Sequence, residues 1–221
     1  MSLQDKLDAF KAEFEGKKAP PEVVAVFHRS TAELIARGQA ARALNVGDRA
    51  PAFRLPDSGR ATVTSAELLA KGPLVVTFYR GAWCPYCNMD LQAIEAAASQ
   101  IRSLGASLVA ISPQTPASSS KSQRDNALSF PILSDHGGEI AAAFGLRWRV
   151  QEELKAVMTG FKVDLAVFNG EPSWTLPMPA RYVIASDGLI AYSEVNPDYT
   201  RRPDPSELLP ILQRLRRSAA A

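Results

Sequence analysis

The sequence predicts an α/β domain in which a central sheet is covered by helices. Short apolar runs rich in β-branched residues alternate with stretches of helical periodicity. The runs at 74–79 and 108–111 flank a helical stretch at 84–104. Further along, a hairpin at 182–195 precedes a closing helix. Strand, helix and strand followed by a hairpin and a helix are typical of a sheet with helices packed on its faces.

Two helical stretches are expected before this domain. Apolar residues repeat at helical spacing over residues 3–17, and a second such stretch follows Pro20 and Pro21. Together they are too short to hold a core of their own. We therefore interpret residues 1–44 as an N-terminal helical extension and residues 45–221 as the main domain. The pattern leaves open whether the extension packs on the main domain or forms a dimer contact.

The later segments carry clear local signals. Residues 112–121 are rich in Pro and Ser and are expected to form a loop. Short helices are expected at 139–144 and 152–158. The closing helix should begin at Asp204 as N-cap, with Pro205 at the first helical position and Glu207 three residues after the cap.

Composition narrows the function classes. Of 221 residues, 46% are hydrophobic and 22% are charged, which is typical of a globular protein. The net charge of +2 is too close to neutral to favour nucleic-acid or membrane binding. Basic residues do cluster late in the chain, where cations suit the last turn of a helix. They are Arg201, Arg202, Arg214, Arg216 and Arg217.

Location and cysteine content favour reactive thiols. No apolar run approaches the length of a membrane span, and residues 1–18 lack the features of a signal peptide. A cytoplasmic location is therefore expected. Because a reducing cytosol keeps thiols reduced, the two cysteines are expected to be reactive rather than structural.

The segment at 78–87, FYRGAWCPYC, carries the chemistry. A buried strand ends there, a short loop follows, and a helix is expected to begin at Cys84. Unpaired N–H groups and a partial positive charge at a helix N-terminus favour the thiolate, which is the nucleophile. Pro85 suits the first helical position. The spacing lets Cys84 and Cys87 form a disulfide across one turn, and Arg80 adds positive charge. The pattern predicts a redox-active pair.

Three other interpretations of the pair are weaker. A zinc site needs two further ligands, and the only imidazoles are those of His28 and His136. Free cysteines are often buried and inert. A hydrolase would pair Cys84 with one of the two histidines, neither of which has a recognisable setting. We therefore expect neither a metal nor a cofactor.

From about residue 45 onward the chain resembles the peroxiredoxin family, the alkyl hydroperoxide reductase and thiol-specific antioxidant group. The matching pieces occur in the family's order. They are VGDRAPAFRL at 46–55, FY at 78–79, FPILSD at 130–135, AFG at 143–145, YVI at 182–184 and DG at 187–188. The resemblance implies a thioredoxin-like fold with a central mixed sheet flanked by helices. It also implies an enzyme that reduces hydrogen peroxide or organic hydroperoxides. Residues 1–44 lie outside it.

The family's spacing assigns roles to the pair. Peroxiredoxins place Pro-x-x-x-Thr-x-x-Cys after the strand, which puts Cys87 at the peroxide-attacking cysteine, Cys84 at the Thr and Arg80 at the Pro. The family's peroxide-binding Arg corresponds to Pro179, and Arg181 lies two residues later on the same strand face. In this scheme Cys87 attacks and Cys84 resolves. Arg80 or Arg181 stabilises the developing charge.

The segment in which this chain differs from the peroxiredoxin pattern resembles another branch of the thioredoxin fold. Trp83 and the two cysteines form a Trp-Cys-x-x-Cys segment similar to that of thioredoxins, and Cys-Pro-Tyr-Cys is similar to glutaredoxins. Those proteins place a cis-proline opposite the pair, so we expect a cis bond before Pro179. In this scheme the chain reduces protein or small-molecule disulfides, with Cys84 attacking and Cys87 resolving. Trp83 is expected to shield the site, to form a docking surface or simply to pack against its neighbours.

A third hypothesis is a non-enzymatic redox sensor, whose dithiol changes state and exposes the N-terminal helices to a partner. The family spacing favours the peroxidase, whereas Cys84 at the Thr position and Pro179 at the Arg position favour the disulfide reductase. The resemblance implies a thioredoxin or a glutaredoxin/glutathione system as reductant. The sequence leaves open which cysteine attacks first, whether the substrate is a peroxide or a disulfide, and whether the chain forms a homodimer.

Overall fold

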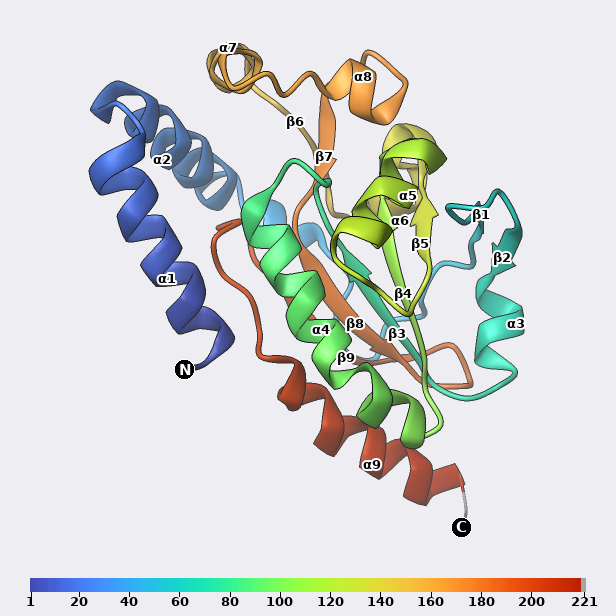
Figure 1. Ribbon diagram of the computed structural model, residues 1–221. Helices are drawn as coiled ribbons and strands as arrows, with labels where there is room; N and C mark the ends of the chain where they lie inside the picture. The colour runs from blue at the N-terminus through green and yellow to red at the C-terminus, as the bar shows by residue number, and fades with distance from the viewer. Residues whose placement is uncertain (220–221) are drawn as a thin grey trace.

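The computed structural model describes residues 1–219, and a five-stranded mixed sheet lies at its centre (Figure 1). The strand order is β5-β4-β3-β8-β9. Their bounds are β3 (Leu74–Phe78), β4 (Ser107–Ser112), β5 (Ile132–Ser134), β8 (Ala180–Ile184) and β9 (Ile190–Val195). Strands β3, β4 and β5 are parallel, whereas β8 runs antiparallel to both β3 and β9. The predicted α/β architecture with a mixed sheet is confirmed.

Helices surround this sheet, and two small strand pairs lie outside it. The helices are α1 (Leu3–Glu13), α2 (Pro21–Ala36), α3 (Ser65–Leu69), α4 (Pro85–Ser103), α5 (Pro116–Asp125), α6 (Glu139–Ala143), α7 (Glu152–Gly160), α8 (Leu165–Asn169) and α9 (Leu208–Ala219). The small pairs are β1 (Arg54–Pro56) with β2 (Thr62–Thr64), and β6 (Arg147–Arg149) with β7 (Thr175–Pro177).

Strand β3 divides its side chains between two cores. Val75 on this strand, and Tyr79 just after it, join the core that α1, α4 and α9 cover. Val76 and Phe78 join the core on the opposite face, beside α6. Successive side chains of a strand point to opposite faces, which explains the division. Because α4 covers the Tyr79 face, the start of α4 lies in the same core as the end of β3.

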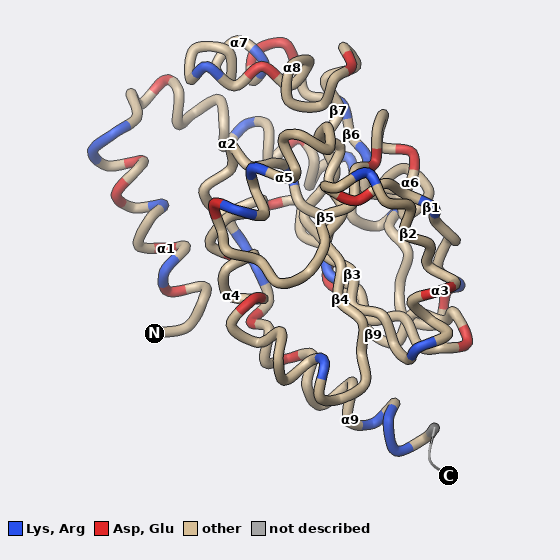
Figure 2. Tube along the Cα trace, turned by 45° about the vertical axis from the view of Figure 1, so that its right-hand side comes forward, with Lys and Arg blue, Asp and Glu red and all other residues tan. Residues whose placement is uncertain are grey.

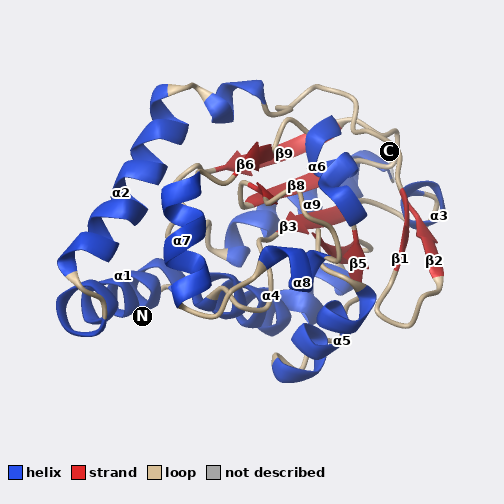
Figure 3. Cartoon of the chain, turned by 90° about the horizontal axis from the view of Figure 1, so that it is seen from above, coloured by secondary structure: helices blue, strands red, loops and turns tan. Residues whose placement is uncertain are grey.

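The two N-terminal helices form as predicted and pack on their own chain. Leu3 and Leu7 of α1 are buried in the core that contains α4. Val26 of α2 is buried with Leu154 of α7, and Figure 3 shows α2 and α7 side by side. A π-helical turn, Phe14–Lys18, continues α1 before the chain turns into α2.

One expected loop is a helix. Residues 116–125 form α5, although Ser and Pro dominate the start of this stretch. The side chain of Thr115 accepts a hydrogen bond from the backbone N–H of Ser118, and Pro116 begins the helix. Ser119 and Ser122 are buried against the core. Composition predicted a loop, but capping and tertiary packing stabilise a helix here.

The start of the closing helix is as predicted. Asp204 and Glu207 form a capping box around a 3-10 turn, Pro205–Glu207, which leads into α9. The side chain of Asp204 accepts a hydrogen bond from the N–H of Ser206. The expected helices at 139–144 and 152–158 correspond to α6 and α7.

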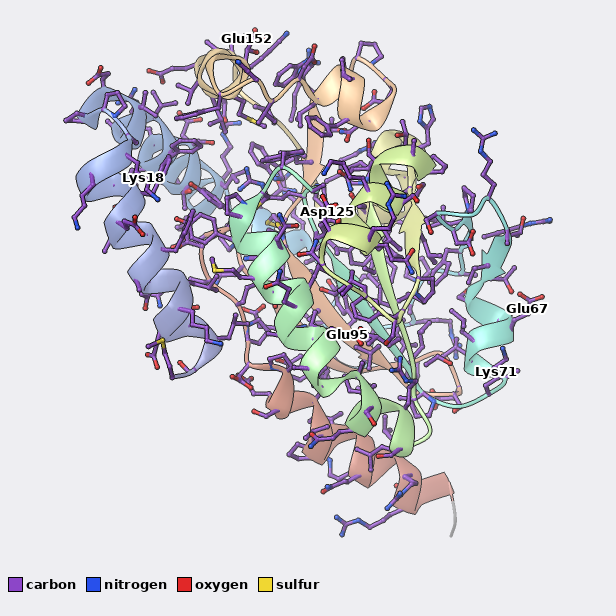
Figure 4. All side chains as sticks on the ribbon, in the orientation of Figure 1. Lys18, Glu67, Lys71, Glu95, Asp125 and Glu152 are labelled. Atoms are coloured by element: carbon purple, nitrogen blue, oxygen red, sulfur yellow. The ribbon has the colours of Figure 1, made fainter. Side chains whose placement is uncertain are left out.

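Charged side chains of both signs are spread over the outside of the molecule. Figure 2 shows basic and acidic segments interspersed along α1, and a basic segment near the end of α9. Figure 4 places Glu67 and Lys71 at the outer edge on and just after α3, Lys18 on the opposite side after α1, and Glu152 at the top on α7. None of the helices within residues 1–219 is long and apolar enough to cross a bilayer.

Gly145 marks a close approach between the main domain and the segment that leads into it. Its φ is +74°, and a Cβ there would lie 2.1 Å from the carbonyl oxygen of Arg42. We predict that Gly145→Ala lowers the free energy of unfolding by at least about 2 kcal/mol, measured by urea denaturation, because it adds a left-handed side chain to a backbone clash. Gly160→Ala, where nothing lies within 4 Å, should change stability by less than about 1 kcal/mol. Equal effects of the two substitutions would contradict the close approach.

Candidate active site

The loop between β3 and α4 is held by side-chain hydrogen bonds. The backbone N–H of Ala82 donates to Oε1 of Gln114 at 2.8 Å, and Nδ2 of Asn88 donates to the carbonyl oxygen of Ala82 at 2.9 Å. Cys84 is the N-cap residue of α4, and Pro85 begins the helix. The predicted order of strand, loop and helix start is therefore present, and Gln114 and Asn88 hold the loop at Ala82.

The helix start brings the two cysteines together. Both are reduced, and their sulfur atoms lie 2.9 Å apart, within hydrogen-bond distance for sulfur. Cys84 is 2% exposed and Cys87 is fully buried. The thiols therefore form a buried pair on the first turn of α4.

An arginine that sequence reasoning did not single out contacts this pair. Nη2 of Arg202 donates to Sγ of Cys87 at 3.4 Å, and its Nε lies 3.4 Å from Oδ2 of Asp90. Arg202 follows β9 in an irregular segment and is buried. Arg202 precedes the closing helix α9, so it is not among the basic residues of that helix's last turn, which are Arg216 and Arg217.

Asp90 links Arg202 to Arg181. The Asp90 carboxylate forms an ion pair with each of the two guanidinium groups, and Arg181 also donates to the carbonyl oxygen of Pro203 at 2.9 Å. Asp90 lies three residues after Cys87, so both side chains leave the same side of α4. Arg181, proposed from the sequence as a peroxide ligand, contacts Asp90 and not the cysteines. Arg181 therefore helps to position the Asp90 carboxylate, which in turn pairs with Arg202.

The surroundings give the two thiols different acidities. Burial by itself raises the pKa of Cys87. The hydrogen bond from Cys84 and the charges of Arg202 and Arg80 outweigh that effect and lower the pKa from 9.0 to about 6. Burial, followed by the hydrogen bond and the charge of Cys87, raises the pKa of Cys84 well above its usual value. Either sulfur could carry the proton between them, but the cations favour a thiolate on Cys87 and a donating thiol on Cys84.

Arg80 lies between two aromatic rings beside the pair. Its guanidinium carbon is 4.2 Å from the ring centroid of Tyr199 and 4.8 Å from that of Trp83. A Cβ at Gly81, whose φ is +152°, would lie 2.4 Å from Nε1 of Trp83. Glycine at this position therefore lets the Trp83 ring fold back over the loop and contact Arg80.

A pocket of about 300 Å³ opens outside Cys84. Cys84 lines this pocket, whereas Cys87 does not. Tyr86, which lies between the two cysteines, is buried, because its ring meets Phe10 of α1 and Tyr199 edge-on at 5.2 and 5.5 Å. The N-terminal helices thus cover a residue that the loop alone would leave open.

The expected cis bond before Pro179 is absent, since all peptide bonds within residues 1–219 are trans. Pro179 connects β7 to β8, and its carbonyl oxygen accepts a hydrogen bond from the N–H of Asn196 at 3.3 Å. The chain runs almost directly from one strand into the next, so no sharp turn requires a cis bond. Pro179 lines a small cavity with Arg80 and Tyr199 and is not part of the pocket at Cys84.

Helix α1 braces the segment that carries Arg202. Oε1 of Gln4 accepts a hydrogen bond from the backbone N–H of Arg202 at 3.1 Å, and its Nε2 donates to the carbonyl oxygen of Thr200 at 3.4 Å.

Within residues 1–219, no group of three or more His, Cys, Asp or Glu side chains is arranged to hold a metal ion.

Comparison with known proteins places this geometry in a family. The AhpC/TSA family profile matches residues 46–193, which is about two thirds of the chain and includes both cysteines. The chain belongs to the AhpC/TSA family. The match begins after the N-terminal helices and ends before Arg202.

Individual relatives agree with this assignment. A putative peroxiredoxin of Mycobacterium tuberculosis is 30% identical over 122 residues, covering 55% of this chain and 79% of that protein. Peroxiredoxin Bcp of Escherichia coli is 28% identical over 103 residues, covering 47% and 65% of the two chains. The crystal structure of peroxidoxin BcpB from M. tuberculosis superposes with a TM-score of 0.61 at 22% identity, covering 77% of this chain and 97% of that one. The chain has the thioredoxin-like fold of these peroxiredoxin structures.

The charge beside Cys87 gives a direct prediction for its acidity. Arg202→Met should raise the pKa of Cys87 above its value of about 6, because the thiolate loses its guanidinium donor. The thiolate absorbance near 240 nm, followed in a pH titration of the reduced protein, measures this shift. Arg201→Met is the matched control, since the neighbouring Arg201 side chain is 52% exposed. A Cys87 titration that is the same in both variants would show that Arg202 does not set the acidity.

Proposed function

We propose that this protein is a thiol peroxidase that reduces hydroperoxides through a dithiol–disulfide cycle of Cys87 and Cys84. The observation that most supports the proposal is the buried Arg202 guanidinium on the Cys87 sulfur. A buried cation at this place stabilises the thiolate, and it also stabilises the negative charge that develops when a peroxide bond breaks. Relatives named peroxiredoxins support the same reaction class.

The first step is attack of the Cys87 thiolate on the terminal oxygen of a hydroperoxide. An S–O bond forms and the O–O bond breaks, so Cys87 becomes a sulfenic acid. The other oxygen leaves with the electron pair and is protonated to an alcohol or to water. Arg202 and Arg80, whose charges both act on Cys87, stabilise the transition state.

The second step is condensation with Cys84. Its sulfur attacks the Cys87 sulfenic acid, water leaves, and a disulfide of about 2.0 Å forms. The two sulfurs already lie 2.9 Å apart on one helical turn, so little backbone movement is needed. A thioredoxin or a glutaredoxin/glutathione system would then restore both thiols by thiol–disulfide exchange. Because the cycle needs such a reductant, the proposal includes a cytoplasmic location.

A second candidate function has one observation in its favour. Cys84 lines the pocket and Cys87 does not, so a disulfide substrate entering there would meet Cys84 first. In this alternative Cys84 attacks the disulfide and Cys87 resolves the mixed disulfide. The raised pKa of Cys84 opposes it, because a protonated thiol is a poor nucleophile. The redox-sensor hypothesis and a homodimer stay predictions.

Single-cysteine variants distinguish the two orders of attack. In stopped-flow mixing of the reduced protein with hydrogen peroxide, we expect Cys87→Ser to lose the fast reaction, since it removes the activated thiolate. Cys84→Ser should still react in a first turnover and accumulate a sulfenic acid that dimedone traps. Tryptophan fluorescence follows the rate, and mass spectrometry identifies the modified residue.

The opposite pattern has an equally clear meaning. If Cys84→Ser abolishes the fast phase and Cys87→Ser retains it, the attacking residue is misassigned. If the intact dithiol reacts no faster than free cysteine but rapidly reduces a disulfide substrate, the peroxidase proposal fails and the disulfide reductase takes its place.

A further inference from the structure

Arg80 is a buried cation without a carboxylate partner among the described residues, although its charge acts on the Cys87 sulfur. Its side chain is buried, its Nε has no hydrogen-bond partner, and no carboxylate within residues 1–219 forms a salt bridge with it. Its guanidinium lies over the faces of Trp83 and Tyr199. Burying an unpaired charge is costly, and aromatic faces offset only part of that cost. An anion is therefore the group that this position lacks.

The other charges at the site are already matched. Asp90 forms ion pairs with Arg181 and Arg202, and Arg202 also donates to Cys87. A further carboxylate, that of Glu194, acts on Arg181 and Arg202 and forms no salt bridge with Arg80. The carboxylates of Asp90 and Glu194 thus act on Arg181 and Arg202. Arg80 is the guanidinium group of this site that has no carboxylate partner among the described residues.

The Arg80 guanidinium lines an apolar pocket. Arg80 and Cys84 both line the cavity of about 300 Å³, and most of the other lining groups are aromatic or aliphatic. The N-terminal helices and the turn that joins them supply Phe10, Phe14 and Phe27. The volume is at the lower end of the range for small-molecule sites. An occupant should thus have a compact apolar body and an anionic end near the sulfurs.

We propose that the pocket binds an apolar monocarboxylate whose carboxylate pairs with Arg80, and that this is the product of reducing an apolar peroxy acid. The planar guanidinium fork matches a carboxylate, which can accept two parallel hydrogen bonds. The carboxylate end lies beside the thiol pair because Arg80 does. The aromatic side chains of the N-terminal helices enclose the apolar body.

The reaction part rests on the proposed peroxidase function, and it requires the peroxy group to pass Cys84, which lines the pocket, and reach the Cys87 sulfur 2.9 Å from the Cys84 sulfur. The Cys87 thiolate attacks the terminal oxygen of a peroxy acid, the S–O bond forms, and the O–O bond breaks. The electron pair leaves on the inner oxygen, so the products are a sulfenic acid and a carboxylate. An alkyl hydroperoxide leaves an alkoxide, which takes up a proton. The peroxy acid leaves a stable anion, and Arg80 is placed to hold it.

Binding is tested first, on the intact reduced protein and without any reaction. Octanoate and octanol have the same chain length, and only octanoate carries a charge. By calorimetry, with quenching of tryptophan fluorescence as a second readout, we expect octanoate to bind at least about tenfold more tightly, as a charge-assisted pair would provide. Equal affinities, or no binding of either probe, would overturn the proposal without any variant.

Variants then assign the effect to Arg80. Arg80→Met should remove the advantage of octanoate while leaving octanol unchanged, and Arg80→Lys should restore part of it. Arg201→Met, at an exposed site, should leave both affinities unchanged. If Arg80→Met is poorly folded by circular dichroism, Arg80→Lys and the two-probe comparison still decide. Retention of the octanoate advantage in a folded Arg80→Met would overturn the assignment.

The reaction part has its own readout. The ratio of the rate with peroxyoctanoic acid to the rate with hydrogen peroxide should fall in Arg80→Met, because both rates share the acidity of Cys87 and only one needs the carboxylate partner. An unchanged ratio would overturn it. Rapid hydrogen peroxide reduction by Cys87 together with no octanoate binding would leave the peroxidase standing and remove only this inference. Slow reaction with both oxidants would instead count against the peroxidase itself.

Discussion

The carboxylate of Asp90 is the interaction on which the rest of the site depends. It joins α4 to β8 through Arg181 and to the segment after β9 through Arg202. Because Asp90 lies one turn beyond Cys87, the Arg202 guanidinium that it holds also reaches the Cys87 sulfur. Buried ion pairs contribute little net stability once desolvation is counted. We therefore infer that this network serves to hold the Arg202 guanidinium against the Cys87 sulfur, at some cost in the stability of the fold.

The N-terminal helices contribute to the site in two ways. Gln4 of α1 hydrogen-bonds to the backbone of Arg202 and so fixes the segment that carries the critical guanidinium. Phe10, Phe14 and Phe27 form one side of the pocket outside Cys84. These helices lie outside the residues that match the family. The thiol pair thus lies within the residues that match the family, whereas Arg202 and the aromatic side chains of the N-terminal helices lie outside them.

Local sequence signals predicted the elements that local interactions determine. The buried strand before Arg80, the helix start at Cys84 and the capping box at Asp204 each follow from a few neighbouring residues, and each is present. The prediction of a loop at 112–121 was wrong, because Ser119 and Ser122 of α5 are buried by tertiary contacts that composition does not reveal. The family resemblance implied the mixed sheet with helices on its faces, whereas the strand order, which no local pattern encodes, came from the structure.

The charges at the site could not be predicted in the same way. Arg201 and Arg202 are adjacent and chemically identical, yet one is half exposed and the other is buried on Cys87. Only the path of the chain after β9 distinguishes them. Likewise, nothing near Asp90 in the sequence indicates two arginine partners from distant segments. Pro179 was assigned by analogy with thioredoxins, and the direct run from β7 into β8 removes the need for the expected cis bond.

The most direct test of this account is a pH titration of both thiols in the reduced, unmodified protein. Cysteine labelled with ¹³C at Cβ reports each protonation state by NMR, and single Ser variants assign the two signals. The account predicts that Cys87 titrates at about 6 and that Cys84 remains protonated well above its usual range. A titration in which Cys84 loses its proton first would contradict the central claim that the Asp90–Arg202 network places the thiolate on Cys87.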